Sequence, residues 1–249
     1  MACAARVQVG PFGQRFWAVY ANSEARLRER TLMLGGRGAV ELDPGPLGRR
    51  GGRIATSRGR VMVRDGGVLL DLRLEENGGI EARCRHGRGE VWTRKQAGIP
   101  ARGIFALDGR RPREIEALAV IDDTAGYHAR RTEWWWTAGV GEDRDGLAVA
   151  WNLVAGVNDP PTGSERAVWI GGRPLEAPSV KFADDLSRVW SADGSELSFR
   201  PVAERSRHEN LLIIRSDYRA PFGTFSGKLP GGVDLARGLG VVEHHRVRW

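Results

Sequence analysis

A carboxylate stands directly before three consecutive tryptophans in the segment Glu133-Trp134-Trp135-Trp136. In a β-strand, successive side chains point to opposite faces, so Trp134 and Trp136 share one face while Glu133 and Trp135 share the other. One interpretation is a core strand that is buried on both faces. The other is a pocket wall, in which the neighbouring indole desolvates Glu133, raises its pKa and lets it act as an acid. The residues alone leave both interpretations open.

Two further carboxylates lie in strands that are otherwise largely apolar. Glu243 falls on the mostly apolar face of the strand expected over residues 239–249, where a charge is costly unless it is paired. Asp217 presents the same choice between an ion pair and a functional acid, and Arg215 is an available partner two residues away. The candidate catalytic residues, as acids or charge stabilisers, are Glu133, Glu243 and Asp217.

Polar and aromatic residues near these acids are the candidates for ligand contact. Asn152 lies in an apolar strand, and a buried amide needs partners, so it makes either a core hydrogen bond or a ligand contact. Asn158 belongs to the longest irregular stretch, residues 156–166, and a loop of that size in a compact β domain is often functional. His128 follows Tyr127 just before the tryptophan strand, at the expected rim of a pocket. The candidate ligand-binding residues are Tyr127, His128, Trp134, Trp135, Trp136, Asn152, Asn158 and Tyr218.

The elements that must position these residues follow a sequence period of two. Short β-rich runs recur along the chain, separated by turn signals such as Asp65-Gly66-Gly67 and Asn77-Gly78-Gly79. No long amphipathic helix alternates with them, which argues against a parallel α/β sheet and favours a sandwich or an up-and-down barrel. The expected strands around the candidate residues are 132–140, 147–154, 167–170, 186–191, 196–200, 211–218, 223–229 and 239–249.

The chain of 249 residues is long enough for one or two domains with a real core. The segment 122–126 is the best seam, because the formal charge changes there from +9 over residues 1–120 to −2 over residues 121–249. We therefore expect two all-β domains, 1–121 and 122–249.

Composition limits the partners. The net charge of +7 comes almost entirely from arginine, yet no helix-turn-helix, zinc finger or RNA-binding signature is present, so we expect no nucleic-acid partner. Apolar runs are too short to cross a bilayer and no leader segment is visible, which predicts a cytoplasmic protein without a transmembrane segment. Cys3, Cys84 and the five histidines lack metal-ligand spacing, so no metal and no cofactor are expected. The oligomeric state cannot be inferred from these features.

Five segments resemble a bacterial family catalogued as domain of unknown function 2804, and the resemblance covers nearly the whole chain. They are Val91–Gly98 (VWTRKQAG), Asp123–His128 (DTAGYH), Trp151–Val154 (WNLV), Arg215–Tyr218 (RSDY) and Pro221–Gly227 (PFGTFSG).

A more distant resemblance is to double lipocalin-like barrels of the carotenoid hydratase and tocopherol cyclase type, which carry a Glu-Trp-Trp-Tyr element. Here Glu133-Trp134-Trp135 matches, and Trp136 replaces the tyrosine and its phenolic hydroxyl. The resemblance implies two lipocalin-like barrels or half-barrels and a cavity for an apolar or amphipathic small molecule. It also implies acid-assisted isomerisation, hydration or cyclisation, with tryptophan rings stabilising a developing cation.

Two alternatives stay open at this point. One is a carbohydrate-active protein with tryptophans stacked on sugar and two carboxylates about 5–10 Å apart. The other is a non-catalytic structural or partner-binding protein, so the sequence leaves open whether the protein is an enzyme.

Overall fold

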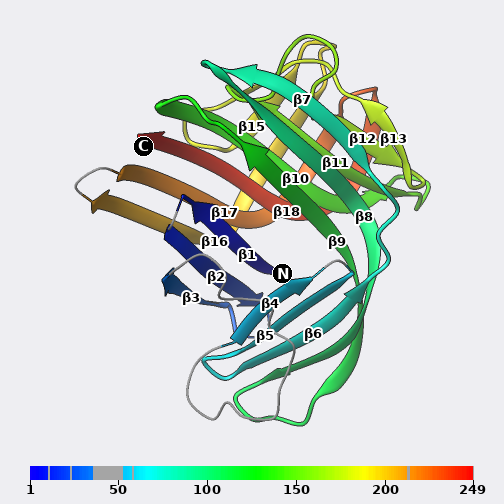
Figure 1. Ribbon diagram of the computed structural model, residues 1–249. Coiled ribbons are helices and arrows are strands. Elements are labelled where there is room, and N and C mark those ends of the chain that lie inside the picture. Colours follow the sequence, from blue (N-terminus) through cyan, green and yellow to red (C-terminus); the bar gives the residue numbers. More distant parts are fainter. Residues whose placement is uncertain (11, 23, 36–52, 58, 212–213, 249) are drawn as a thin grey trace. The chain divides into compact units, whose positions relative to one another are not determined.

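The computed structural model describes residues 1–10, 12–22, 24–35, 53–57, 59–211 and 214–248 (Figure 1). Every regular element in this part of the chain is a β-strand, so the expected all-β class is confirmed. The described residues contain no helix long and apolar enough to cross a membrane.

The chain divides into two compact units, and each unit is built from two separate stretches of sequence. Unit 1 consists of Met1–Glu76 and Pro100–Ala117, and unit 2 consists of Asn77–Ile99 and Leu118–Trp249. Two long strands, β8 (Gly89–Leu107) and β9 (Arg113–Gly126), therefore contribute residues to both units. The expected division into two domains, 1–121 and 122–249, stays a prediction.

Unit 1 contains an antiparallel three-stranded sheet and a meander. The sheet pairs β1 (Ala2–Val9), β2 (Phe12–Ala21) and β3 (Arg26–Gly35) in that order. The meander runs through β4 (Arg53–Ser57), β5 (Arg60–Asp65) and β6 (Val68–Leu74) to the second half of β8. Trp17 is buried, and its indole N–H donates to Asp65 at 2.9 Å, so the ring satisfies its polar atom inside the unit.

Unit 2 is built on a nine-stranded antiparallel sheet in the order β13-β12-β11-β10-β18-β17-β16-β15-β14. The edge strand β14 lies beside β11, so the sheet curls back on itself as a half-barrel and the expected barrel or half-barrel architecture is confirmed. The strands are β10 (Arg131–Asp143), β11 (Ala148–Ala155), β12 (Ala167–Ile170), β13 (Arg173–Glu176), β14 (Val180–Phe182), β15 (Arg188–Ser191), β16 (Glu196–Leu211), β17 (Ile214–Leu229) and β18 (Val233–Arg248).

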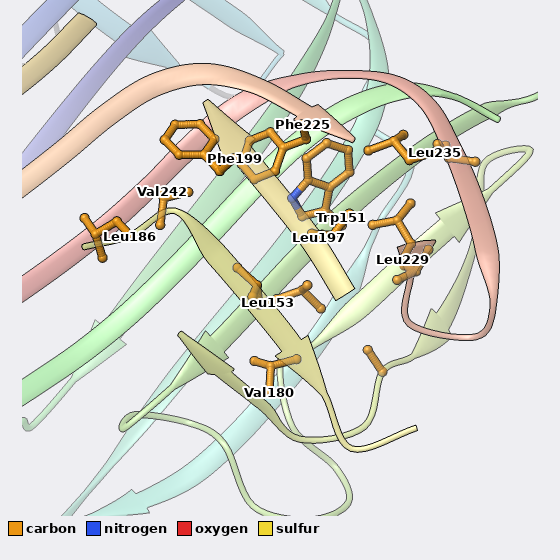
Figure 2. Packing of buried hydrophobic residues seen from close by; sticks show 14 residues of the cluster. Trp151, Leu153, Val180, Leu186, Leu197, Phe199, Phe225, Leu229, Leu235 and Val242 are labelled. Atoms are coloured by element: carbon orange, nitrogen blue, oxygen red, sulfur yellow. The ribbon is translucent and has the colours of Figure 1, made fainter. Parts of the chain in front are cut away.

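One face of this sheet, which we call the core face, carries the main hydrophobic core. Trp151 and Leu153 of β11 are fully buried there against Phe225 of β17, Leu197 of β16 and Val242 of β18 (Figure 2). The rings of Trp151 and Phe225 meet edge to face at 4.9 Å. Burial of these large side chains supplies most of the apolar stabilisation of unit 2.

The opposite face, which we call the site face, is covered by β7 (Ile80–His86) and by the unit 2 parts of β8 and β9. Close approach is possible because the facing residues are small: Ala97 packs with Ala150 and Ala167. At Gly98, where φ is +71°, a Cβ atom would lie 3.2 Å from the Ala150 Cβ. This cover brings charged residues of β8 and β9 over the polar side chains of the site face.

Candidate functional site

The site face gathers the candidate residues because β10 and β18 pair in antiparallel register. Trp134 lies opposite His245 and Trp136 lies opposite Glu243. Directly paired residues point to the same face of a sheet, so all four side chains stand together. The Trp134 indole N–H donates to a Glu243 oxygen at 2.8 Å.

Glu243 is a carboxyl group in a desolvated position. Burial raises its pKa to about 7, and the negative charge of Asp122 adds to this effect. Hydrogen bonds from Trp134 and Tyr218 and the positive charge of Lys95 act in the opposite direction and only partly offset it. Near neutral pH this group is therefore about half protonated and can donate a proton. In the described part of the chain Glu243 has no ion pair with an arginine, the pairing that the sequence suggested as its structural explanation.

An aromatic frame surrounds Glu243 on its own face. The His245 ring lies 4.3 Å from the Trp134 ring and 5.2 Å from the Tyr218 ring. His245 Nε2 is 2.8 Å from the Ser216 hydroxyl. Burial lowers the pKa of His245 to about 4; His244 lowers it further, Asp217 partly opposes this, and Arg205 adds the smallest lowering. The imidazole is therefore neutral at physiological pH.

A chain of hydrogen bonds holds Trp136 on the other side of Glu243. The Trp136 indole N–H donates to Asn152 Oδ1 at 2.8 Å, and Asn152 Nδ2 donates to the Glu165 carbonyl at 2.8 Å. Asn158 Nδ2 donates to the Glu165 carboxylate at 3.1 Å. Asn152 thus makes a core hydrogen bond, and the long loop at residues 156–166 reaches the site through Glu165.

A buried charge network lies next to the site. Lys95 of β8 is nearly inaccessible and pairs with Asp122 of β9 and, at 3.4 Å, with Glu165. Burial lowers the pKa of Lys95, but the two carboxylates outweigh this and raise it above its ordinary value. Lys95 therefore stays charged and holds β8 and β9 to the loop, because removing one partner of such a network leaves an uncompensated buried charge.

Glu133 lies on the core-face side of β10, opposite to Glu243. Its carboxylate accepts hydrogen bonds from Arg246 at 2.7 Å and from His244 at 2.9 Å. The Arg246 hydrogen bond lowers the pKa of Glu133, so the expectation of a raised pKa is wrong for this residue. The reason is that an arginine lies directly opposite Glu133 in the register of β10 and β18. Trp135, on the same face, stacks on His244 at 4.6 Å.

The remaining candidate residues lie apart from Glu243. Asp217 is exposed and contacts His208 Nδ1 at 2.6 Å, whereas Arg215, its expected partner, donates instead to Asn210. The three candidate carboxylates are thus not brought to one place. Their roles in catalysis stay predictions.

Tyr127 and His128, the two candidates for the rim of a pocket, lie just before the start of β10. Tyr127 is 82 % exposed. The His128 ring meets the His86 ring edge to face at 5.4 Å, and burial lowers its pKa. Both residues lie between β9 and β10, so their role in ligand contact is still a prediction.

Sequence reasoning missed part of this arrangement. Lys95, Asp122 and Glu165 come from three separate segments, and no local pattern predicts that they meet. Ser216 and His245 were also missed, because the pair His244-His245 was considered only as possible metal ligands. The one available signal was the alternation along β18, which places His245 on the face of Glu243.

A curled antiparallel sheet with a half-buried carboxylic acid on its covered face defines the class of this protein as an all-β half-barrel with a candidate acid site. The chain belongs to the family described as Domain of unknown function (DUF2804), whose model matches residues 75–249. This match takes in all the site residues described above. No curated protein matches the sequence.

Solved structures similar to this chain include the following two. Kievitone hydratase from Nectria haematococca superposes with a TM-score of 0.61 at 12% identity, covering 98% of this chain and 82% of that one. An ATTH-like protein from Nitrosomonas europaea gives a TM-score of 0.46 at 12% identity, covering 97% and 84%. The first likeness shows a shared fold, in agreement with the distant similarity to lipocalin-like hydratases and cyclases.

Proposed function

We propose that unit 2 binds an apolar or amphipathic small molecule on the site face and that Glu243 donates a proton to it. The reaction class is acid-assisted isomerisation, hydration or cyclisation of a carbon–carbon double bond. The observation that carries this proposal is the position of Glu243, a carboxyl group desolvated among the rings of Trp134, Trp136 and Tyr218 with its pKa raised to about 7.

Protonation of a double bond by a carboxylic acid creates a carbocation and a carboxylate. The aromatic rings beside Glu243 stabilise positive charge through their π faces, and the newly formed carboxylate adds electrostatic stabilisation. Trp134 keeps its hydrogen bond to Glu243 throughout, so the acid is held in place for the transfer. The site therefore fits a reaction in which charge develops on carbon.

An apolar track on the site face extends from Glu243 along the strands. Val241 and Leu239 follow on β18, and Val140 lies opposite Leu239 on β10. Leu239 is 44 % exposed, so its side chain is accessible to a ligand. Leu239 lies four residues from Glu243, so the two are about 13 Å apart along the strand, the length of an extended chain of about ten carbon atoms. This track supports an amphipathic ligand with its reactive end at Glu243.

The fold comparison supports hydration among the three reactions, because the half-barrel architecture is shared with a protein known as a hydratase.

Binding of a cationic amphiphile tests the proposal. Decyltrimethylammonium imitates the developing cation and its apolar tail, and quenching of tryptophan fluorescence reports its binding. We expect affinity to rise as pH increases through about 7, because Glu243 becomes a carboxylate over that range. The neutral amphiphile decanol should bind without this pH dependence.

Matched isosteric variants test whether Glu243 causes this pH dependence of binding. Glu243→Gln should bind decyltrimethylammonium with no pH dependence near 7, whereas Glu142→Gln, an exposed glutamate of β10 paired with Arg237, should behave as the wild type. Absence of binding of both amphiphiles to the wild type, or pH dependence that persists in Glu243→Gln, would contradict the proposal.

A further inference from the structure

We propose that three arginines at one end of the nine-stranded sheet form a binding site for a phosphoryl group that carries two or more negative charges. Their side chains lie on the core-face side of the sheet, outside the hydrophobic core, and are exposed. The site is thus on the opposite face from Glu243, and the inference goes beyond the proposed function. We call these residues the arginine row: Arg131 of β10, Arg248 of β18 and Arg215 of β17.

The strand register places the three arginines side by side. Arg131 pairs directly with Arg248, and Arg248 pairs directly with Arg215, at the end of β18 next to the C-terminus (Figure 1). Directly paired residues of an antiparallel sheet point to the same face, with Cβ atoms about 4.5–5.5 Å apart. Arginine carries its charge at every physiological pH, so three positive charges start from neighbouring points on one surface.

The next row of the same sheet accommodates charge in a different way. Two residues along the strands, the directly paired positions alternate between acidic and basic side chains, and we call them the alternating row: Glu133, Arg246, Asp217 and His208. Each acid there contacts a basic neighbour, Glu133 through Arg246 at 2.7 Å and Asp217 through His208 at 2.6 Å. The arginine row lacks this alternation, although like charges directly opposite each other are destabilising.

Within the part of the chain that the structure describes, no carboxylate forms an ion pair with any member of the arginine row. The two acids that lie closest to it along the strands, Glu133 and Asp217, bind members of the alternating row instead. The repulsion among the three arginines is therefore not relieved by a described acidic side chain.

Unit 1 contains a comparable row of arginines that has carboxylates at both ends. Arg60, Arg73 and Arg102 pair directly across β5, β6 and β8. Arg60 donates two hydrogen bonds to Asp71, at 2.8 and 2.7 Å, and Arg102 lies 3.4 Å from Glu116. That row receives its negative charge from the chain itself, whereas we expect the arginine row of unit 2 to receive it from a ligand.

Asn210 of β16 continues the site beside Arg215. It lies directly opposite Arg215, and its Oδ1 accepts a hydrogen bond from Arg215 Nε at 3.1 Å. This bond holds the guanidinium in place while its Nη groups can donate to a ligand. Guanidinium groups match the geometry of phosphate oxygens, which they bind through pairs of N–H donors.

The charge of the arginine row favours a phosphoryl ligand over a carboxylate. The strands that carry Arg131 and Arg215 are about 9.6 Å apart, so long side chains from both can converge on one group above Arg248. A carboxylate supplies one negative charge to three cations, whereas a phosphate monoester supplies about two and a diphosphate more. A soluble phosphate ester and a lipid with a phosphate monoester headgroup offer the same oxygens to this site.

Isothermal titration calorimetry of the full chain with pyrophosphate tests the binding. Arg248→Gln should lower the affinity at least about tenfold, because the central arginine loses its hydrogen bonds to a charged group. Arg102→Gln, from the row of unit 1, is the matched control and should bind as the wild type does. Equal losses in the two variants, or no binding of pyrophosphate by the wild type, overturn the inference.

Thermal unfolding at low ionic strength tests the repulsion. Arg248→Gln should melt at a higher temperature than the wild type, because it removes two like-charge contacts, whereas Arg246→Gln should melt at a lower one, because it removes hydrogen bonds to Glu133. Pyrophosphate should raise the Tm of the wild type more than sodium chloride of equal ionic strength, and should act on Arg248→Gln no more than that salt does. A lowered Tm of Arg248→Gln, or equal effects of the two salts on the wild type, would show that the inference is wrong.

Flotation with lipid vesicles distinguishes the two sources of the phosphoryl group. Vesicles that contain phosphatidic acid, a phosphate monoester, are compared with phosphatidylglycerol vesicles of equal surface charge. Preference for phosphatidic acid that is lost in Arg248→Gln identifies a lipid headgroup, and binding of phenyl phosphate without flotation identifies a soluble ester, so either result supports the site. Equal flotation with both lipids that persists in Arg248→Gln shows attraction to charge alone and overturns the inference. Arg248→Gln should keep the pH-dependent binding of decyltrimethylammonium, so a failure here leaves the proposed function of Glu243 standing.

Discussion

The two faces of the β10–β18 pair carry the same three residue types and give them opposite properties. On the core-face side, Glu133 meets Arg246 and His244, and its pKa is lowered. On the site face, Glu243 meets Trp134, Tyr218 and a desolvated imidazole, and its pKa is raised to about 7. Tryptophan, glutamate and histidine are present in both sets.

The pKa values of Glu133 and Glu243 differ for two reasons: one charged neighbour, and the strands that cover the site face. Arg246 lies opposite Glu133 and supplies both charge and hydrogen bonds, whereas Trp136 lies opposite Glu243 and supplies neither. The strands β8 and β9 then lie over the site face, and loss of solvation is the largest influence on the pKa of Glu243, whereas the Arg246 hydrogen bond is the largest influence on that of Glu133. The chemistry of a residue in this strand pair therefore depends on the face that its side chain occupies. A shift of the register by one residue would move each side chain to the opposite face.

The largest expected effect is on the stability of the core face. Trp151→Ala should lower the free energy of unfolding by about 3–5 kcal/mol, because the fully buried ring leaves a cavity among Leu153 and Phe225. Trp134→Ala on the site face should cost less, since that ring is only partly buried. Urea unfolding of both variants measures the difference, and equal losses would contradict the distinction between the faces.

The next effect is the pH dependence of stability caused by Glu243. Its pKa is about 7 in the folded protein and its ordinary value is 4.5, so the unfolded chain ionises first and stability falls as pH rises from about 4.5 to 7. Glu243→Gln removes this loss. Relative to the wild type, the variant should therefore gain about 3 kcal/mol between pH 4 and pH 8. A difference that does not change with pH would show that Glu243 is solvated.

The smallest effect, and one of opposite sign, is expected at Glu133. Its lowered pKa stabilises the folded state at pH values above the unfolded pKa, and this stabilisation is lost as pH falls through the folded pKa. Glu133→Gln should therefore be slightly less stable than the wild type at pH 7, and the difference should be smaller at pH 3. Thermal unfolding at the two pH values measures this. Should Glu133→Gln instead follow the slope of Glu243→Gln, the two faces would be electrostatically alike.

Much of the local structure could be predicted from the sequence. The period of two and the Asp-Gly and Gly-Gly turns predicted the strands at 132–140, 147–154 and 239–249, and alternation correctly placed Trp134 and Trp136 on one face. Alternation also placed Glu243 on an apolar face, where a costly charge suggested a function.

The partners across the sheet could not be predicted in this way. The hydrogen bond from Trp134 to Glu243 joins residues 109 positions apart, and nothing local distinguishes that pairing from others. The same holds for Lys95 and Asp122, which reach the site through the packing of β8 and β9. A raised pKa was one of two interpretations for Glu133, because an adjacent tryptophan is visible in the sequence, whereas an arginine opposite it on another strand is not.

The pairing of β10 with β18 also has a consequence for synthesis of the protein on the ribosome. The strand that carries three consecutive tryptophans is made more than 100 residues before its partner, which corresponds to about 5–20 seconds of translation. During that interval one edge of β10 has no partner strand, and pairing of such distant segments is slow. Nascent chains stalled before β18 should therefore be the species most prone to aggregate and most dependent on chaperones.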